Sequence, residues 1–327
     1  MKIIFAGSPL IAVPALEAII AEQEIILAGV LTNPDTSKGR SGKLEPTDVG
    51  AVAEKISKQF TTAGKPALEI LKPEKLDSAV REQIAALNPD LLVSFAYGRI
   101  FGPKFLSLFP MGGINIHPSL LPKYRGATPI PAAILNRDSE TGISIQKIAP
   151  EMDCGDILAK EIVQLNGRET TENLNKIMAE KAARLLPRVL KDIAAGKTHE
   201  TPQNHAEAGY CSLIKKEDGI IDWNLSALEI DARIRAFDPW PLCSTTYAGQ
   251  LLYILEAAPI DAEISEKQPG LVFDKDKKQG ILIQTGNGVL AVKALQLQGK
   301  KPLEWLAFLN GSRNFIGSRL GVQETGN

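Results

Sequence analysis

The sequence from Gly113 to Gly126 reads Gly-Ile-Asn-Ile-His-Pro-Ser-Leu-Leu-Pro-Lys-Tyr-Arg-Gly. Side chains alternate between the two faces of a strand, so Asn115 and His117 share one face. Pro118 cannot continue a central strand, and the chain must leave the sheet where these two polar groups emerge. Ligands bind at this carboxyl edge in open α/β sheets, which makes the pair a candidate site. The simpler alternative is a half-buried strand end whose histidine caps a backbone carbonyl.

Short apolar runs alternate with helical patterns on both sides of this stretch, which is typical of βαβ units around a mostly parallel sheet. We therefore predict a doubly wound α/β domain over residues 1–195. Its strands are expected at Lys2–Ala6, Ile25–Leu31, Leu91–Phe95, Gly113–His117, Gly142–Ile148 and Ile157–Leu165. Its helices are expected at Ala12–Glu22, Asp48–Lys58, Leu76–Leu87, Pro129–Arg137 and Thr171–Ala195.

The second part of the chain has a different pattern. Residues 196–209 are polar and irregular, as in a linker, and residues 210–327 are expected to form a separate domain. Short strands recur there with tight turns, for example on either side of Gly286-Asn287-Gly288. A small, OB-like β-barrel suits so many short strands. Pro302–Leu309 is predicted as a short closing helix.

The composition excludes several classes of protein. The chain has 327 residues, 44% hydrophobic and 23% charged, with a net charge of −1. It is not a wholly cationic nucleic-acid binder, so any contact with nucleic acid must come from local patches. No apolar run approaches membrane-spanning length, and Met1–Gly7 is too short for a secretory signal. Three scattered cysteines indicate neither a disulfide framework nor a zinc site, and we expect a reducing cytoplasm and no metal.

Two acidic residues lie in a loop between predicted strands, in the sequence Met152-Asp-Cys-Gly-Asp156. We expect Asp153 to face His117, because a nearby carboxylate orients an imidazole and favours its charged form. The alternative is an Asx-turn, and Asp156 is the weaker candidate of the two. Gly7-Ser8-Pro9 follows the first strand but lacks the glycine spacing of a dinucleotide site, so we interpret it as a tight turn.

A polar loop leaves the second strand at Asn33 and continues to Lys43. It carries Lys38, Arg40 and Lys43 among glycines and small hydroxyl residues, with Asp35 as its only acid. Such a loop is expected to be mobile and is usually a solvated surface feature. It also has the composition of a flexible arm that binds phosphates.

Together these motifs closely resemble the methionyl-tRNA formyltransferase family, within the wider family of enzymes that use 10-formyltetrahydrofolate. The hallmark stands here as Asn115-Ile-His117, then Ser119-Leu-Leu-Pro122 and Lys123-Tyr-Arg-Gly126, with Asp153-Cys-Gly-Asp156 further on. The resemblance extends into the second domain and covers Met1 to about Phe315. Its C-terminal hallmarks are Ile221-Asp-Trp223, Arg235–Pro241, Gly286–Gly288 and Gly299–Lys301.

The resemblance implies roles for individual residues. Asn115, His117 and Asp153 match the family's catalytic residues, and Ser119, Leu120, Leu121 and Pro122 match its folate-binding segment. Lys38, Arg40 and Lys43 lie in the matching transfer-RNA-binding insertion, with Arg40 aligned to its key arginine. The implied donor is 10-formyltetrahydrofolate, without a metal, and the implied partner is methionyl initiator transfer RNA.

Further expectations concern the surfaces around these residues. Phe95–Gly98 is a second candidate wall for the folate. Basic residues of the second domain could form a one-sided track for RNA or could be ordinary solvated lysines: Lys275–Lys278, Lys293, Lys300 and Lys301. We expect a monomer without membrane contact.

The sequence also allows two other functions. A folate-dependent formyltransferase acting on an amino sugar nucleotide or a glycinamide substrate would share the three site residues. A non-catalytic RNA-binding protein with a degenerate folate fold would not need them.

Overall fold

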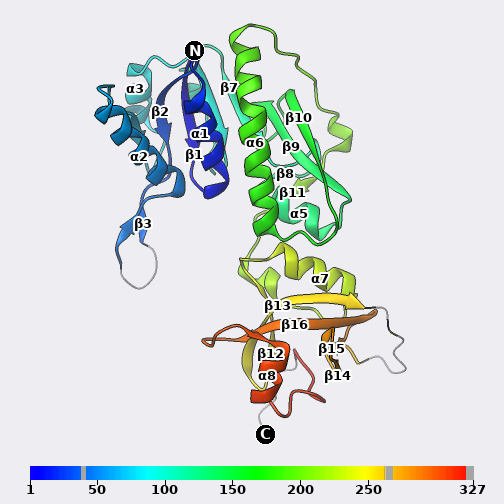
Figure 1. Cartoon of the computed structure of the whole chain (residues 1–327). Helices are drawn as coiled ribbons and strands as arrows, with labels where there is room; N and C mark the ends of the chain where they lie inside the picture. Colours follow the sequence, from blue (N-terminus) through cyan, green and yellow to red (C-terminus); the bar gives the residue numbers. More distant parts are fainter. Residues whose placement is uncertain (38–41, 261, 263–267, 322–327) are drawn as a thin grey trace. The chain divides into compact units, whose positions relative to one another are not determined.

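The computed structural model describes residues 1–37, 42–260, 262 and 268–321 (Figure 1). The chain divides into two compact units. The first unit comprises Met1–Pro129, Glu140–Gln164 and Asn175–Ser212. The second unit comprises Ile130–Ser139, Leu165–Leu174 and Leu213–Asn327.

A seven-stranded sheet forms the centre of the first unit, in the order β10-β9-β7-β6-β1-β2-β5. The strands β5, β2, β1, β6 and β7 are parallel, whereas β9 and β10 run antiparallel to their neighbours. The bounds are β1 Lys2–Gly7, β2 Ile26–Leu31, β5 Glu69–Leu71, β6 Leu91–Phe95, β7 Gly113–His117, β9 Glu140–Lys147 and β10 Ile157–Gln164. The doubly wound, mostly parallel sheet is confirmed. The short strand β5 was missed.

The apolar residues of the parallel strands form the core of this unit. All five residues of β6 are buried, as expected for a strand covered on both faces. One cluster joins Ile4, Leu31 and Leu92 from three strands to Ile84 and Phe105 from helices. The helices of the predicted α/β repeats are α1 Val13–Ala21, α2 Asp48–Thr62, α3 Ser78–Ala86, α5 Pro129–Leu135 and α6 Thr171–Ala194, and α4 Pro103–Leu106 is additional. Nearly all of α5 and the first residues of α6 are assigned to the second unit.

The strand order reverses between β1 and β6. From β1 the chain builds β2 and β5 on one side, and then β6 and β7 on the other. The crevice at the carboxyl ends beside such a switch point is the usual ligand site of an open α/β sheet. His117 ends β7, which is the next strand after β6.

The antiparallel pairing of β7 with β9 sets the neighbours of the candidate residues. Asn115 is the register partner of Gln146, and His117 is the partner of Ser144. Because directly opposed side chains lie on the same face of a sheet, β9 adds two polar side chains to this edge.

The polar loop after β2 has more structure than its composition predicted. Thr36–Ser37 (β3) and Leu44–Glu45 (β4) pair as an antiparallel ribbon. Backbone hydrogen bonds between the two ends of the loop supply this order without a buried core. Residues 38–41 at its tip lie outside the described residues.

Residues 196–209, expected as a linker by composition, belong to the first unit together with residues 210–212. Thr201 exchanges backbone hydrogen bonds with Ile157, and Tyr210–Cys211 (β11) pairs in parallel with Arg125–Gly126 (β8). Gln203 is buried. The Gln203 side chain binds backbone carbonyls of the loop that follows β9, whereas most other residues of this segment are exposed.

The second unit is built on an antiparallel sheet in the order β12-β13-β16-β15-β14, with β17 also paired to β16. The bounds are β12 Cys243–Tyr247, β13 Gln250–Ile260, β14 Val272–Asp276, β15 Gly280–Gln284, β16 Val289–Leu297 and β17 Leu303–Glu304. Register shifts at Glu256 bend the long strand β13, a feature of small curved β-domains. The predicted short strands of the second part of the chain and the turn at Gly286–Gly288, which joins β15 to β16, are confirmed.

Two helices accompany this sheet. The closing helix α8 runs from Trp305 to Gly311, three residues later than predicted at its start. The helix α7 (Ala227–Ala236) was not predicted, although Ser226 and Glu229 form a capping box at its start.

A cavity of about 750 Å³ in this unit is lined by α7, β13 and residues 133–138 and 165–170. Of the helices within the described residues, none has the length and apolar composition needed to cross a membrane.

Candidate active site

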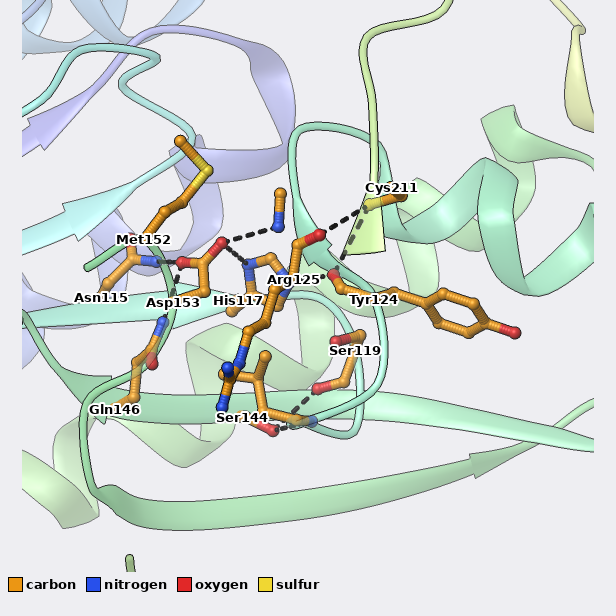
Figure 2. Close-up of polar contacts among 12 residues, drawn as sticks. Asn115, His117, Ser119, Tyr124, Arg125, Ser144, Gln146, Met152, Asp153 and Cys211 are labelled. Atoms are coloured by element: carbon orange, nitrogen blue, oxygen red, sulfur yellow. Dashed lines mark hydrogen bonds and ion pairs between the residues drawn. The ribbon is translucent and has the colours of Figure 1, made fainter. Parts of the chain in front are cut away.

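Asn115, His117 and Asp153 lie together at the carboxyl end of β7 (Figure 2). Asn115 and His117 come from the strand itself, and Asp153 comes from the loop between β9 and β10. The Nδ1 atom of His117 is 3.7 Å from Oδ2 of Asp153, and Nδ2 of Asn115 is 3.4 Å from Oδ1. The structure therefore brings the three predicted residues together, and Asp153 does not face bulk solvent.

The Asp153 carboxylate is surrounded by N–H donors. Oδ1 accepts hydrogen bonds from the Gln146 amide at 2.9 Å and, more weakly, from Asn115. Oδ2 accepts from the backbone N–H of Gly126 at 2.9 Å. Both oxygens of this carboxylate are therefore held by donors from three different segments of the chain.

The orientation of His117 is set mainly by a backbone carbonyl. Its Nε2 lies 2.8 Å from the carbonyl oxygen of Tyr124, which can only accept, so Nε2 carries a proton. Tyr124 has a φ of 60°, and this left-handed conformation is part of the turn that presents the carbonyl. The simpler alternative from the sequence, a histidine that caps a carbonyl, is thus also present. The other ring nitrogen, Nδ1, is the one that faces Asp153.

A half-buried thiol contacts the same carbonyl. The Sγ atom of Cys211 lies 3.5 Å from the Tyr124 oxygen and 3.4 Å from the Arg125 oxygen. Burial raises the pKa of the Cys211 thiol, which keeps it neutral and able to donate weakly. The polar groups around His117 thus form a continuous network (Figure 2).

The exposure of the three residues fits a site that a ligand can reach. His117 is 4% exposed, whereas Asn115 and Asp153 are half-buried. Met152, immediately before Asp153, is 59% exposed. An exposed thioether beside half-buried polar groups offers an apolar surface next to the candidate chemistry.

The Ser119–Pro122 segment is only partly available to a ligand. Ser119 and Leu121 are completely buried, and Ser144 Oγ donates to the Ser119 carbonyl while accepting from the Leu121 N–H. Leu120 and Pro122 are half-buried, and Leu120 packs on Gly142 of β9. The surface that this segment can present therefore comes from Leu120 and Pro122, while Ser119 and Leu121 hold its shape.

Sequence reasoning missed several groups that hold this site. Gln146 and Ser144 alternate with apolar residues on β9, and this alternation was the available signal. Lys160 on β10 donates to the carbonyl oxygen of Leu121. Burial lowers the pKa of Lys160, with the charge of Glu207 opposing that effect. Its place beside the segment could not be inferred from the local sequence.

The candidate wall at Phe95–Gly98 lies at the carboxyl end of β6. Ala96 and Gly98 are exposed and have positive φ angles, whereas Phe95 and Tyr97 are buried. The Asn33 amide donates to the Tyr97 carbonyl oxygen at 3.1 Å, and Arg99 Nε donates to the Asn33 Oδ1 atom at 2.9 Å. The start of the polar loop is therefore fixed to this wall.

Of the loop cations, Lys38 and Arg40 lie outside the described residues. Lys43 is exposed. The basic residues of the second unit are exposed at Lys275, Lys277, Lys278, Lys300 and Lys301. Lys293 is half-buried, with its Nζ 3.8 Å from a carboxylate oxygen of Glu256.

Within the described ranges, no group of three or more His, Cys, Asp or Glu side chains is placed to hold a metal ion. The polar groups at the end of β7 are instead one imidazole, amides and a single carboxylate. This set can donate hydrogen bonds, bind a developing negative charge and move a proton.

Comparison with known proteins gives one consistent result. The formyl transferase family matches residues 1–190, and the formyl transferase C-terminal domain family matches residues 213–313. A methionyl-tRNA formyltransferase of Treponema denticola is 50% identical over 97% of this chain and 98% of its own length. One from Borreliella burgdorferi is 38% identical over 97% of this chain and 98% of its own. The sugar 3N-formyl transferase WlaRD has a similar fold, with a TM-score of 0.62 and 20% identity over 92% of this chain and 99% of that one.

Proposed function

This chain belongs to the methionyl-tRNA formyltransferase family, and we propose that it uses Asn115, His117 and Asp153 to formylate methionyl initiator transfer RNA. The formyl donor is 10-formyltetrahydrofolate, and the acceptor is the α-amine of the esterified methionine. The amine nitrogen bonds to the formyl carbon, and the bond from that carbon to the folate nitrogen then breaks. The products are formylmethionyl-tRNA and tetrahydrofolate. The observation that carries this proposal is the cluster of the three side chains at one sheet edge.

Asn115 binds the oxygen that becomes negative as the amine adds. An amide has two N–H donors, and the contact with Asp153 uses one of them at the long distance of 3.4 Å. A preorganised donor of this kind stabilises a developing oxyanion by about 3–4 kcal/mol. Asn115 is therefore the oxyanion-binding donor of the proposed reaction.

His117 handles the proton through Nδ1, because Nε2–H is engaged by the Tyr124 carbonyl. The proton lost by the amine must reach the folate nitrogen that leaves, and an imidazole on the same edge can relay it. Asp153 stabilises the cationic imidazole across the 3.7 Å separation. A free α-amine titrates near pH ~8, so positioning contributes more than base catalysis.

The residues at the sheet edge fit a folate. Leu120 and Pro122 offer apolar surface beside the three polar residues, and the exposed backbone at Ala96 and Gly98 forms a second wall at the switch point. Flat aromatic ligands are generally bound through apolar side chains and a few backbone groups of this kind. Ser119 and Leu121 are buried and do not contact the folate directly. They hold the backbone conformation that presents Leu120 and Pro122 to it.

The transfer RNA is bound by local cationic surfaces, since the chain as a whole has a net charge of −1. The loop with Lys38, Arg40 and Lys43 and the exposed lysines of the second unit supply these surfaces. The first unit is thus the catalytic domain and the second unit contributes to RNA binding. The enzyme acts as a monomer in the cytoplasm, where translation starts.

The test is an acceptor assay with the purified chain. We expect mass spectrometry to detect one added formyl group on methionyl initiator tRNA after incubation with 10-formyltetrahydrofolate. An amino sugar nucleotide and glycinamide ribonucleotide are offered separately under the same conditions. Formylation of either small amine in preference to the RNA would reject the proposal, and so would a chain that binds RNA without any transfer.

Replacing Arg40 by alanine is expected to weaken binding of methionyl initiator tRNA. If Arg40 contacts a phosphate, the slope of log K against log salt should decrease by about 1. The measurement is a binding titration at several salt concentrations. Lys58→Ala, an exposed lysine in α2, is the matched control. An unchanged salt slope for Arg40→Ala would remove the loop from RNA binding.

A further inference from the structure

Gln203 is buried directly behind the candidate site, in the segment that joins α6 to the second unit. It is 7% exposed, and its amide nitrogen donates to two backbone carbonyls of the loop that carries Asp153. The distances are 2.9 Å to the Asp153 oxygen and 2.7 Å to the Gly155 oxygen. The same nitrogen lies 3.2 Å from Oε1 of Gln146, whose own amide donates to the Asp153 carboxylate.

The orientation of the Gln203 amide follows from the charge of its other neighbour. Nε and Nη2 of Arg125 lie 3.1 Å and 2.7 Å from Oε1 of Gln203. A guanidinium can only donate, so the oxygen of Gln203 must face Arg125 and its NH2 group must face the three acceptors. Arg125 is itself 1% exposed, and its remaining contacts are with Tyr210 Oη and His205 Nδ1.

The loop that Gln203 binds has an unfavourable backbone conformation at Asp153 and a close approach to β9 at Gly155. Asp153 has a φ of 54°, a left-handed conformation that is unfavourable for a residue other than glycine. Two residues later the chain passes so close to β9 that a Cβ on Gly155 would lie 1.8 Å from the Lys147 carbonyl oxygen. The two carbonyls bound by Gln203 flank this crossing, so its hydrogen bonds fix the conformation that directs the Asp153 carboxylate toward His117.

From these contacts we infer that Gln203 is a positioning residue for Asp153, and that Arg125 fixes the amide in the orientation that this requires. The inference rests on the proposed role of Asp153 in formyl transfer. Gln203 acts through the loop conformation and through Gln146. Residues 203–210, outside the α/β repeats, thus complete the catalytic site.

The test is a substitution that keeps the size of Gln203 and its contact with Arg125 but removes the donor. In Gln203→Glu, one carboxylate oxygen still accepts hydrogen bonds from Arg125. The other oxygen replaces the NH2 group and cannot donate to the three acceptors, so the hydrogen bonds to the Asp153 loop are lost. We expect kcat to decrease on the order of 100-fold, the effect of displacing a reacting group by about 1 Å. KM for the folate donor and KM for methionyl-tRNA should stay at the wild-type values, because Gln203 touches neither binding surface.

Two further variants separate positioning from a general loss of structure. Gln203→Met also removes the donor but adds no charge, and we expect the same loss of kcat with unchanged KM. Gln59→Glu, at an exposed position of α2, is the matched control and should keep the wild-type kcat. Thermal unfolding of each variant reports on folding.

A double-mutant cycle with Asp153→Asn identifies the residue through which Gln203 acts. If Gln203 acts through Asp153, the double variant Asp153→Asn/Gln203→Glu should be no slower than Asp153→Asn alone. Wild-type kcat in both Gln203 variants, or losses that multiply in the double variant, would overturn the inference while leaving the proposed function intact. Full activity in Asp153→Asn would overturn the proposed role of Asp153, and this inference with it.

Discussion

Replacing Asn115 by alanine is expected to lower kcat for formylmethionyl-tRNA formation by about 10²- to 10³-fold. The substitution removes the amide N–H that would bind the developing oxyanion, and that interaction exists only in the transition state. An interaction of this kind affects kcat and kcat/KM equally, so KM for both substrates should change little. Single-turnover kinetics with methionyl initiator tRNA measures the chemical step directly.

The local structure makes Asn115→Ala a clean variant. Asn115 is half-buried, and the only loss at Asp153 is the longest of its hydrogen bonds, at 3.4 Å, since Gln146 and Gly126 still donate to the carboxylate. The midpoint of thermal unfolding and the affinity for transfer RNA should therefore remain close to wild type. Near-full activity would show that another group binds the oxyanion.

Replacing His117 by glutamine is expected to lower kcat by about 10²- to 10⁴-fold, the usual contribution of a general acid–base. Glutamine can still donate a hydrogen bond to the Tyr124 carbonyl, but it cannot accept and release a proton. The variant thus separates the proton relay from the structural contact at Nε2. The measurement is the same single-turnover rate, with binding of each substrate determined separately.

His199→Gln is the matched control for this variant. His199 is exposed and belongs to the same unit, so the identical substitution should leave the rate unchanged. A His117→Gln enzyme with wild-type kcat would reduce His117 to the carbonyl cap that its contact with Tyr124 also allows.

The sheet and the placement of Asn115 and His117 could be predicted because the relevant signals are local. The strand Gly113–His117 has the bounds that its sequence predicts, since alternation and Pro118 both act within a few residues. Asn115 and His117 must then share a face, whatever the rest of the chain does. The contact with Asp153, 36 residues after His117, was expected from the chemistry of an imidazole and from the family resemblance.

The supporting groups could not be predicted in the same way. The carbonyl that orients His117 belongs to Tyr124, and nothing in a side-chain pattern shows where a carbonyl points. Residues 196–209 were expected to be a linker because polar, irregular sequences usually are solvated. Gln203 is an exception, because its side chain is buried against Arg125 and the loop at Asp153. These partners are 78 and 50 positions away along the chain, so the local sequence does not reveal them.

The buried guanidinium of Arg125 limits how far this enzyme could be shortened. Within the part of the chain that the structure describes, its side-chain acceptors are Gln203 Oε1, His205 Nδ1 and Tyr210 Oη, and none of these three is a carboxylate. A fragment that stopped at residue 195 would retain every residue proposed for the chemistry but would lack the three side chains that accept hydrogen bonds from this guanidinium. An uncompensated interior charge costs several kcal/mol, a large part of the roughly 5–15 kcal/mol that holds a domain together. We therefore expect a catalytic fragment to need the chain through about Ser212, where the first unit ends, well past the last α/β repeat.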